Sequence, residues 1–385
     1  MKLFKCVFAI LTVTFFALTA PVSATAAETA TADETVTMPP AYTALPEAIP
    51  PELEALLPDG LFSEEMEEAL TAAAELTDWR YLLNAFASAL GLGLENTLGL
   101  LCVLVGLILL AAVCGRLREG LGGSSGEILG FCLRLTVYTA IVLQTAGAIE
   151  TVQTYFNRLM TLTCGMIPVM GTLYALGGNL GQAAVSSELM LVFLGVCQYV
   201  SATVTPPLCG ACAAFSLMDA LGVRLTLAPL CKQLKRWYAS LLGLVMFLLT
   251  LALSTQSVLV GRADTLGMRG VKYAVGNMIP VVGGAVAGTL TAVGTGIGLL
   301  RGVCGVAGII LVALLLLPTL VELLLLGSTL RLAATVASML ACDGEAKLLE
   351  EMASLHGYLA AAVSVCSVTF VIALALLIHS GTALG

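Results

Sequence analysis

Apolar and polar positions follow one another along this chain in long blocks. Six apolar blocks have about the length of a helix that crosses a lipid bilayer: residues 98–114, 128–149, 183–204, 241–260, 296–317 and 359–378. A helix needs about 20 predominantly apolar residues to cross the hydrocarbon core. The pattern therefore predicts an all-α, polytopic membrane protein.

Composition agrees with this prediction. Of the 385 residues, 59% are hydrophobic and 11% are charged, and the mean hydropathy is +1.00. A soluble domain is roughly half apolar and a quarter charged. The net charge of −8 arises mainly in one segment, because 13 of the 25 acidic residues lie between Glu28 and Asp78, where the chain has no Lys or Arg.

The N-terminus has the pattern of a secretory signal peptide over residues 1–24, with two lysines, a short apolar run and small residues at its end. An uncleaved first helix is the alternative, and both readings predict that the next segment is exported. We expect residues 25–96 to form an exported acidic segment. It would begin as a flexible Pro- and Thr-rich tether and continue as short amphipathic helices over 64–76 and 79–94.

Two similar motifs divide the membrane region. The first contains Met166, Ile167, Pro168 and Gly171, and the second contains Met278, Ile279, Pro280, Gly283 and Gly284. The motif prolines are 112 residues apart, and each is followed 38 residues later by another proline, Pro206 or Pro318. Equal spacings predict an internal duplication of about 112 residues. The expected units are a first transmembrane helix and loop (97–127), repeat 1 (128–239), repeat 2 (240–357), and a last transmembrane helix and tail (358–385).

Proline and glycine in the two motifs predict helices that are broken inside the membrane. We expect the apolar runs 166–176 and 208–223 to be half-spans that re-enter the membrane. Broken helices often line a solute or ion path, because the freed backbone groups need partners. Close packing of helices through small residues explains the same pattern equally well.

Charged residues inside the apolar blocks are costly and therefore mark candidate functional positions. The chain has Arg134, Glu188, Asp219, Arg301 and Glu322 at such places. Under the repeat, Glu188 is equivalent to the neighbour of Arg301, which suggests that these two side chains form an ion pair. The alternative is that the charges lie near the membrane surface and reach water.

The distribution of basic residues tests the topology. With the N-terminus outside and an even number of crossings in each repeat, eight basic residues face the cytoplasm: Arg116, Arg118, Arg224, Lys232, Lys235, Arg236, Arg331 and Lys347. Four then face out: Arg158, Arg262, Arg269 and Lys272. An odd number of crossings in each repeat would place seven basic residues on the cytoplasmic side and five outside. Because cytoplasmic loops carry an excess of Lys and Arg, the even number is favoured.

Catalytic chemistry is not indicated. The chain has two histidines, His356 and His379, and neither has the spacing of a metal ligand. No nucleophile or nucleotide-binding signature is present. Cys209 and Cys212 have C-x-x-C spacing but lie in an apolar stretch without a thioredoxin-like pattern. We expect no enzyme activity, no cofactor, no metal and no nucleic-acid partner.

One passage resembles a known family. The run VKYAVGNMIPVVGG at 271–284, the run LLRGVCGVAG at 299–308 and Pro318 are similar to the stage III sporulation protein AE family. Two departures are present. The family pattern has an acidic residue shortly after the glycine pair, where this chain has 285–288, and a Lys-Asn-like pair where it has Arg301 and Gly302. A polar role at these positions is therefore not carried over.

The resemblance implies a multi-pass subunit of the complex that links mother cell and forespore, located in the outer forespore membrane during sporulation. It implies a pore or export-gate role in late forespore development. Its partners would be membrane lipid and the other membrane and ring-forming proteins of the same complex. The residues themselves leave two alternatives, a self-contained secondary transporter of a small solute and a structural anchor. The small number of paired intramembrane acids weighs against the transporter.

Overall fold

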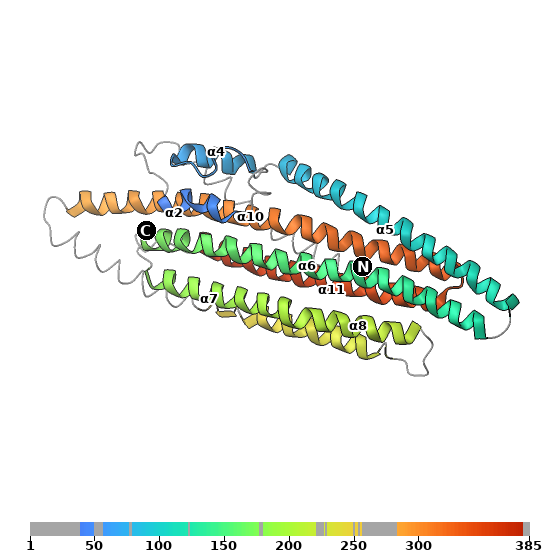
Figure 1. Cartoon of the computed structure of the whole chain (residues 1–385). Helices are drawn as coiled ribbons and strands as arrows, with labels where there is room; N and C mark the ends of the chain where they lie inside the picture. Colours follow the sequence, from blue (N-terminus) through green and yellow to red (C-terminus); the bar gives the residue numbers. More distant parts are fainter. Residues whose placement is uncertain are drawn as a thin grey trace.

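The computed structural model of the chain is an elongated bundle of nearly parallel helices (Figure 1). It describes residues 39–49, 57–76, 79–121, 124–176, 180–220, 227, 229–248, 251–252, 255 and 283–379. The long helices are α5 (Trp79–Leu121), α6 (Ser124–Leu176), α7 (Leu180–Tyr199), α8 (Thr205–Ala220), α10 (Gly283–Met339) and α11 (Asp343–His379). A π-helical turn, η2 (Val200–Val204), joins α7 to α8, and residues 229–248 form a further helix. The described part of the chain is thus all-α, as the apolar blocks predicted.

Five stretches of the described helices are long and apolar enough to cross a membrane. They are Thr97–Arg116, Gly130–Leu173, Leu191–Asp219, Gly302–Met339 and Asp343–Ile372. In the most apolar part of the stretches in α10 and α11, 61% of the residues are buried inside the bundle. In the corresponding part of α5, 17% are buried. Helices α10 and α11 therefore form the centre, and α5 presents large apolar side chains such as Val103 and Val113 outward. This arrangement is consistent with a polytopic membrane protein.

Two antiparallel hairpins build much of the bundle. In the first, α8 packs against helix 229–248, where the Cys231 thiol lies 3.5 Å from the Cys212 carbonyl. In the second, α10 turns at 340–342 and returns as α11. Close approach is required at Gly308 of α10, because a Cβ there would collide with the Met166 methyl of α6 and lie 3.2 Å from Leu374 of α11. Each hairpin carries a proline in its first arm. The duplication itself stays a prediction.

The prediction of broken helices is wrong at the motif proline Pro168 and at Pro318. Helix α6 runs through Pro168, and α10 runs through Pro318. The run 166–176 is accordingly the end of α6 and forms no separate half-span. A proline removes one helical hydrogen bond and costs about 3 kcal/mol, which burial of the flanking turns can offset. Leu314 and Val321, on either side of Pro318, are buried.

Pro206 does coincide with an irregularity. It lies in the first turn of α8, immediately after the π-helical turn η2. The Thr205 hydroxyl donates to the carbonyl of Val200 at 3.3 Å. The backbone N–H of Thr205 donates to the same carbonyl, which is the hydrogen bond of a π-helical turn. The helical path therefore continues from α7 into α8. Run 208–223, expected as a half-span, lies on this path as far as Ala220.

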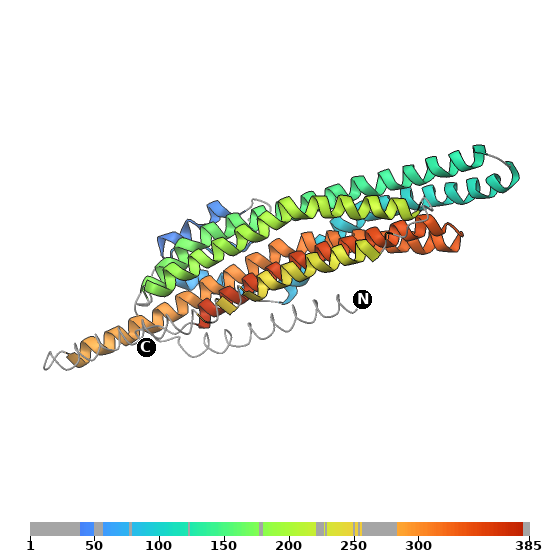
Figure 2. The same ribbon diagram turned by 90° about the horizontal axis from the view of Figure 1, so that it is seen from below.

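The N-terminal segment forms a small cap on one end of the bundle (Figures 1 and 2). The cap contains α2 (Pro40–Thr43), the 3-10 turn η1 (Leu45–Ala48) and α4 (Met66–Leu76), and it contacts α6 and α10. Tyr42 is fully buried, and its hydroxyl donates to the Leu61 carbonyl at 3.0 Å. Burial, and secondarily the nearby Cys304 thiol of α10, raise the pKa of Tyr42.

The flexible tether expected for the N-terminal segment is therefore not found at residues 39–49, which pack against the bundle. Leu45 and Ile49 are buried beside Tyr42. The prolines of this segment reduce the entropy of the unfolded chain, which lowers the cost of ordering it. The helix expected over 64–76 is present as α4. The helix expected over 79–94 is the first part of the much longer α5.

Candidate functional site: a polar pocket between α6 and α10

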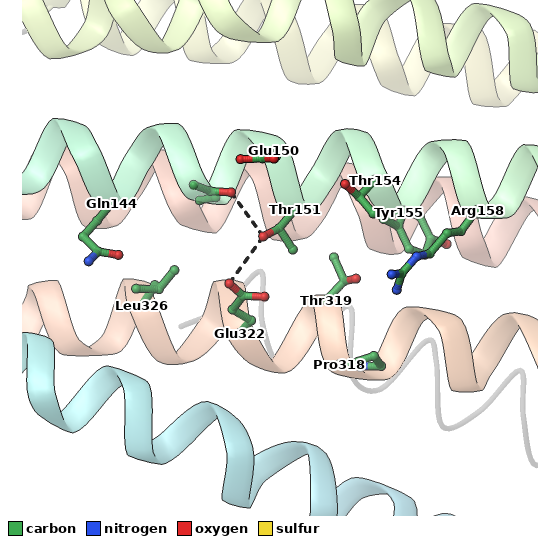
Figure 3. Close-up of a pocket in the computed structure, with 12 residues that line it drawn as sticks. Gln144, Glu150, Thr151, Thr154, Tyr155, Arg158, Pro318, Thr319, Glu322 and Leu326 are labelled. Carbon is green, nitrogen blue, oxygen red and sulfur yellow. Dashed lines mark hydrogen bonds between the residues drawn. The ribbon is translucent and has the colours of Figure 1, made fainter. Parts of the chain in front are cut away.

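A pocket of about 470 Å³ lies between α6 and α10 (Figure 3). Both helices contribute polar side chains to it, although both belong to stretches that are apolar enough to cross a membrane. The lining residues are Gln144, Gly147, Ala148, Glu150, Thr151, Thr154, Tyr155, Arg158, Pro318, Thr319, Glu322 and Leu326. A polar pocket in such surroundings is the strongest candidate for a functional site in the described part of the chain.

The sequence of α6 explains why one side of the pocket is polar. Gln144, Gly147, Thr151, Thr154 and Arg158 follow one another at intervals of three and four residues. This spacing places them on one face of a helix. Gln144, Thr151 and Arg158 point toward α10 (Figure 3). Gln144, Gly147 and Thr154 are exposed, so the pocket is open at the surface of the bundle.

Glu322 is the charged group that α10 contributes. It stands in a run of leucine and valine, and it is half-buried. The Thr151 hydroxyl lies 3.3 Å from a carboxylate oxygen of Glu322 and 3.1 Å from the Gly147 carbonyl (Figure 3). The hydroxyl proton is therefore shared between these two acceptors. This contact fixes the position of Glu322 against α6.

Neighbouring contacts hold the walls of the pocket. The Tyr155 ring is buried, and its hydroxyl forms a 2.5 Å hydrogen bond with the Ser367 hydroxyl of α11. Pro318 and Thr319 lie one helical turn before Glu322 (Figure 3). Pro318 has no N–H, and its ring disrupts the hydrogen bond of the carbonyl four residues earlier. The pocket is thus lined by two helices, α6 and α10, with an altered turn of α10 at one end.

Most of the motif residues lie elsewhere. Met166 is buried over Gly308, Pro168 is exposed, and Ile167 and Gly171 are half-buried in α6. Met278, Ile279 and Pro280 lie outside the described residues. Gly283 and Gly284 begin α10. Among the sequence candidates, the described structure brings Pro318 and Glu322 together in the pocket.

The other charged candidates lie apart from the pocket. Glu188 is exposed on α7, and the Arg301 side chain lies outside the described parts, so their pairing stays a prediction. Asp219 accepts a hydrogen bond of 2.7 Å from the backbone N–H of Leu227, which fastens the turn after α8. Arg134 pairs with Glu345 of α11 at 3.3 Å. Asp219 and Arg134 therefore organise the ends of helices.

The sequence analysis missed the residues of α6 that complete the site. Arg158 was expected only as one of the outward-facing charges, and the other residues of α6 in the pocket were not among the candidates. The regular spacing of polar residues from Gln144 to Arg158 was the signal that could have revealed a polar helix face. The spacing of residues along α6 does not show that this face contacts Glu322. That contact depends on how α6 and α10 pack.

A comparison with protein families gives one match. The family model described as stage III sporulation protein AE matches residues 62–381, which is most of the chain and includes both sides of the pocket. No curated protein and no solved structure matches the chain. The chain therefore belongs to the stage III sporulation protein AE family, whose members are membrane proteins involved in stage III sporulation.

Proposed function

We propose that this protein is a non-enzymatic membrane subunit of the complex that connects mother cell and forespore. In this proposal it supplies the pore or export-gate element, and the pocket between α6 and α10 lies on the solute path. The observation that carries the proposal is the polar face of α6 opposite Glu322, within two long apolar helices. Polar and ionisable residues at such places mark pathways in membrane proteins.

The position of the cap supports an orientation for this subunit. The cap contacts α6 and α10 at the end of the bundle where α6 ends and α10 begins (Figure 2). If the N-terminal segment is exported, this end faces away from the mother-cell cytoplasm. The opposite end then faces the cytoplasm, and it carries Lys232, Lys235, Arg236 and Lys347 beside the turns that follow α8 and α10. The positive-inside rule favours this orientation.

Complementation in the native host tests the proposal. A deletion strain is expected to arrest after engulfment, with small forespores and no late forespore gene expression. Wild-type protein and Glu350→Gln, a control on the exposed surface of α11, should restore spores. Glu322→Gln combined with Thr151→Val should fail to restore them, although the tagged variant reaches the membrane in normal amount. Full sporulation of the double variant would contradict a role for the pocket, and normal spores in the deletion strain would contradict the whole proposal.

A self-contained secondary transporter is the second candidate, and the size of the pocket favours it. A volume of about 470 Å³ lies within the range of small-molecule sites, roughly 300–1,000 Å³. Purified protein in liposomes would separate the two functions. Solute uptake by the protein alone would support the transporter. A requirement for the other proteins of the complex would support the channel subunit.

A further inference from the structure

Helix 229–248 is attached to the bundle by one face only. The buried residues of this helix follow one another at intervals of three and four: Cys231, Lys235, Tyr238, Leu242 and Met246. This spacing places them on a single face. The helix, drawn in yellow, runs along the edge of the bundle beside α8 in Figure 1 and beside α11 in Figure 2. Its opposite face, which we call the outer face, is therefore exposed.

The outer face changes in character along the helix. Lys232 and Arg236 are exposed in its first turns, and neither forms an ion pair or a side-chain hydrogen bond with another described residue. Trp237 comes next and is 68% exposed. Beyond Trp237 the outer face is apolar, and its large exposed side chains are Leu241, Leu244, Phe247 and Leu248. The helix has no Asp or Glu. The outer face thus joins an unneutralised basic end to an apolar remainder.

The length of the apolar part matches one leaflet of a bilayer. From Trp237 to Leu248 an α-helix rises about 16 Å. The hydrocarbon core is about 30 Å thick, so one leaflet contributes about 15 Å. Tryptophan is enriched where the hydrocarbon core meets the headgroups. With Trp237 at this boundary, Lys232 and Arg236 lie at the level of the headgroups, and the apolar part lies along the acyl chains.

We propose that the outer face of helix 229–248 binds an anionic phospholipid. The lipid phosphate lies between Lys232 and Arg236, and an acyl chain lies along the apolar part. Side chains four residues apart on a helix are neighbours, with about 5–6 Å between their Cβ atoms, so both can reach one phosphate. The Arg236 guanidinium can form two parallel hydrogen bonds with phosphate oxygens, and the Lys232 ammonium adds a compact positive charge.

Charge complementarity selects an anionic lipid over a zwitterionic one. Basic side chains near a membrane surface attract anionic headgroups. A phosphocholine headgroup carries a positive charge of its own, which Lys232 and Arg236 would repel. The third basic residue of the helix, Lys235, is paired with Glu351 of α11 and is not available to the lipid. The selectivity therefore depends on two side chains, which makes it accessible to mutation.

Trp237 can report on the lipid beside it. The chain has two tryptophans, so Trp79→Phe leaves Trp237 as the sole indole fluorophore. The full-length variant is reconstituted in phosphatidylcholine vesicles with a small fraction of lipid brominated on its acyl chains, because bromine quenches tryptophan fluorescence on contact. The brominated lipid is either phosphatidylglycerol or phosphatidylcholine. We expect brominated phosphatidylglycerol to quench as though its local fraction were raised about fivefold or more, the factor that one basic side chain contributes.

Double variants separate a site from the overall charge of this end of the bundle. Lys232→Gln with Arg236→Gln should abolish the preference for phosphatidylglycerol. Arg116→Gln with Lys347→Gln removes the same charge from exposed positions near the end of α5 and the start of α11, and it should keep the preference. An equal loss in both double variants would overturn the inference. Loss of the preference on addition of glycerol phosphate would show that the face takes phosphate without the lipid, which also contradicts it.

Native mass spectrometry of the unaltered full-length chain provides a second measurement that does not require Trp79→Phe to fold. Protein in a neutral detergent is mixed with equal amounts of phosphatidylglycerol and phosphatidylcholine. At least one phosphatidylglycerol should stay bound at collision energies that remove phosphatidylcholine. Equal retention of the two lipids would overturn the inference. Neither measurement depends on sporulation, so the result is independent of the proposed function.

Discussion

Lys235 of helix 229–248 is buried, and its ammonium group lies 2.5 Å from the Glu351 carboxylate of α11 and 3.2 Å from the Glu351 carbonyl. The Lys235 side chain is 3% exposed, whereas that of Glu351 is 34% exposed. An ammonium group without a partner at such a place would be costly. The ion pair therefore joins the first hairpin to the second.

This ion pair leads to the first prediction. Glu351→Gln should lower the free energy of unfolding by about 2 kcal/mol, less than the 3–5 kcal/mol of a fully buried pair because Glu351 is partly exposed. Lys235→Met, which removes the buried charge itself, should cost less. Thermal denaturation of the purified protein, followed by circular dichroism, measures both. Lys232→Met, on the exposed face of the same helix, is the control, and equal melting of all variants would contradict the ion pair.

Two buried cysteines predict a specific cross-link. The sulfur atoms of Cys197 on α7 and Cys366 on α11 lie 3.6 Å apart. A variant that keeps this pair as its sole cysteines should form an intramolecular disulfide on mild oxidation, since the side chains already touch. A protease site inserted between α8 and helix 229–248 reveals the bond by gel electrophoresis.

Exposed Cys102 on α5, kept together with Cys366, provides the control pair. It should not cross-link under the same conditions. Failure of the Cys197–Cys366 pair would show that α7 does not pack against α11 as described here.

Labelling of single cysteines tests the proposed orientation. In a cysteine-free background, Glu68→Cys in the cap should react with a membrane-impermeant maleimide on intact protoplasts of vegetative cells that express the chain. Asp343→Cys, at the start of α11, should react after permeabilisation. Both native side chains are exposed, so access is set by the side of the membrane. The reverse labelling pattern would exclude an exported cap.

The two helix prolines should differ in their effects. Pro168 is exposed and distant from the pocket, so Pro168→Ala should preserve sporulation and stabilise α6 by as much as ~3 kcal/mol. Pro318 lines the pocket, so Pro318→Ala should restore a regular turn of α10 there and reduce the yield of heat-resistant spores. Spore counts and melting temperatures of both variants measure this difference. Equal spore yields would argue against a role for the altered turn.

Features encoded by neighbouring residues in the chain could be predicted from the sequence, whereas features set by tertiary packing could not. The apolar blocks and the acidic helix α4 are local patterns, and both were predicted. Continuity through Pro168 and Pro318 was not, because the local helix-breaking signal competes with burial by other helices. The polar face of α6 is visible in the spacing of its residues, but its partner Glu322 is specified by tertiary packing. Burial of Tyr42 likewise depends on helices from distant parts of the chain.

The contact between the cap and α10 has a consequence for the order of events during synthesis. The cap is made early, whereas α10, which it contacts, is made near the end of the chain. Domains generally fold from the N-terminus during translation, but α4 of this cap lacks its α10 packing partner until α10 has been inserted. Apolar side chains of α4 such as Ala69 and Leu76, which are buried in the finished fold, would stay less covered until then. A chain that stops before α10 therefore carries a cap that can pack against α6 but is only partly covered.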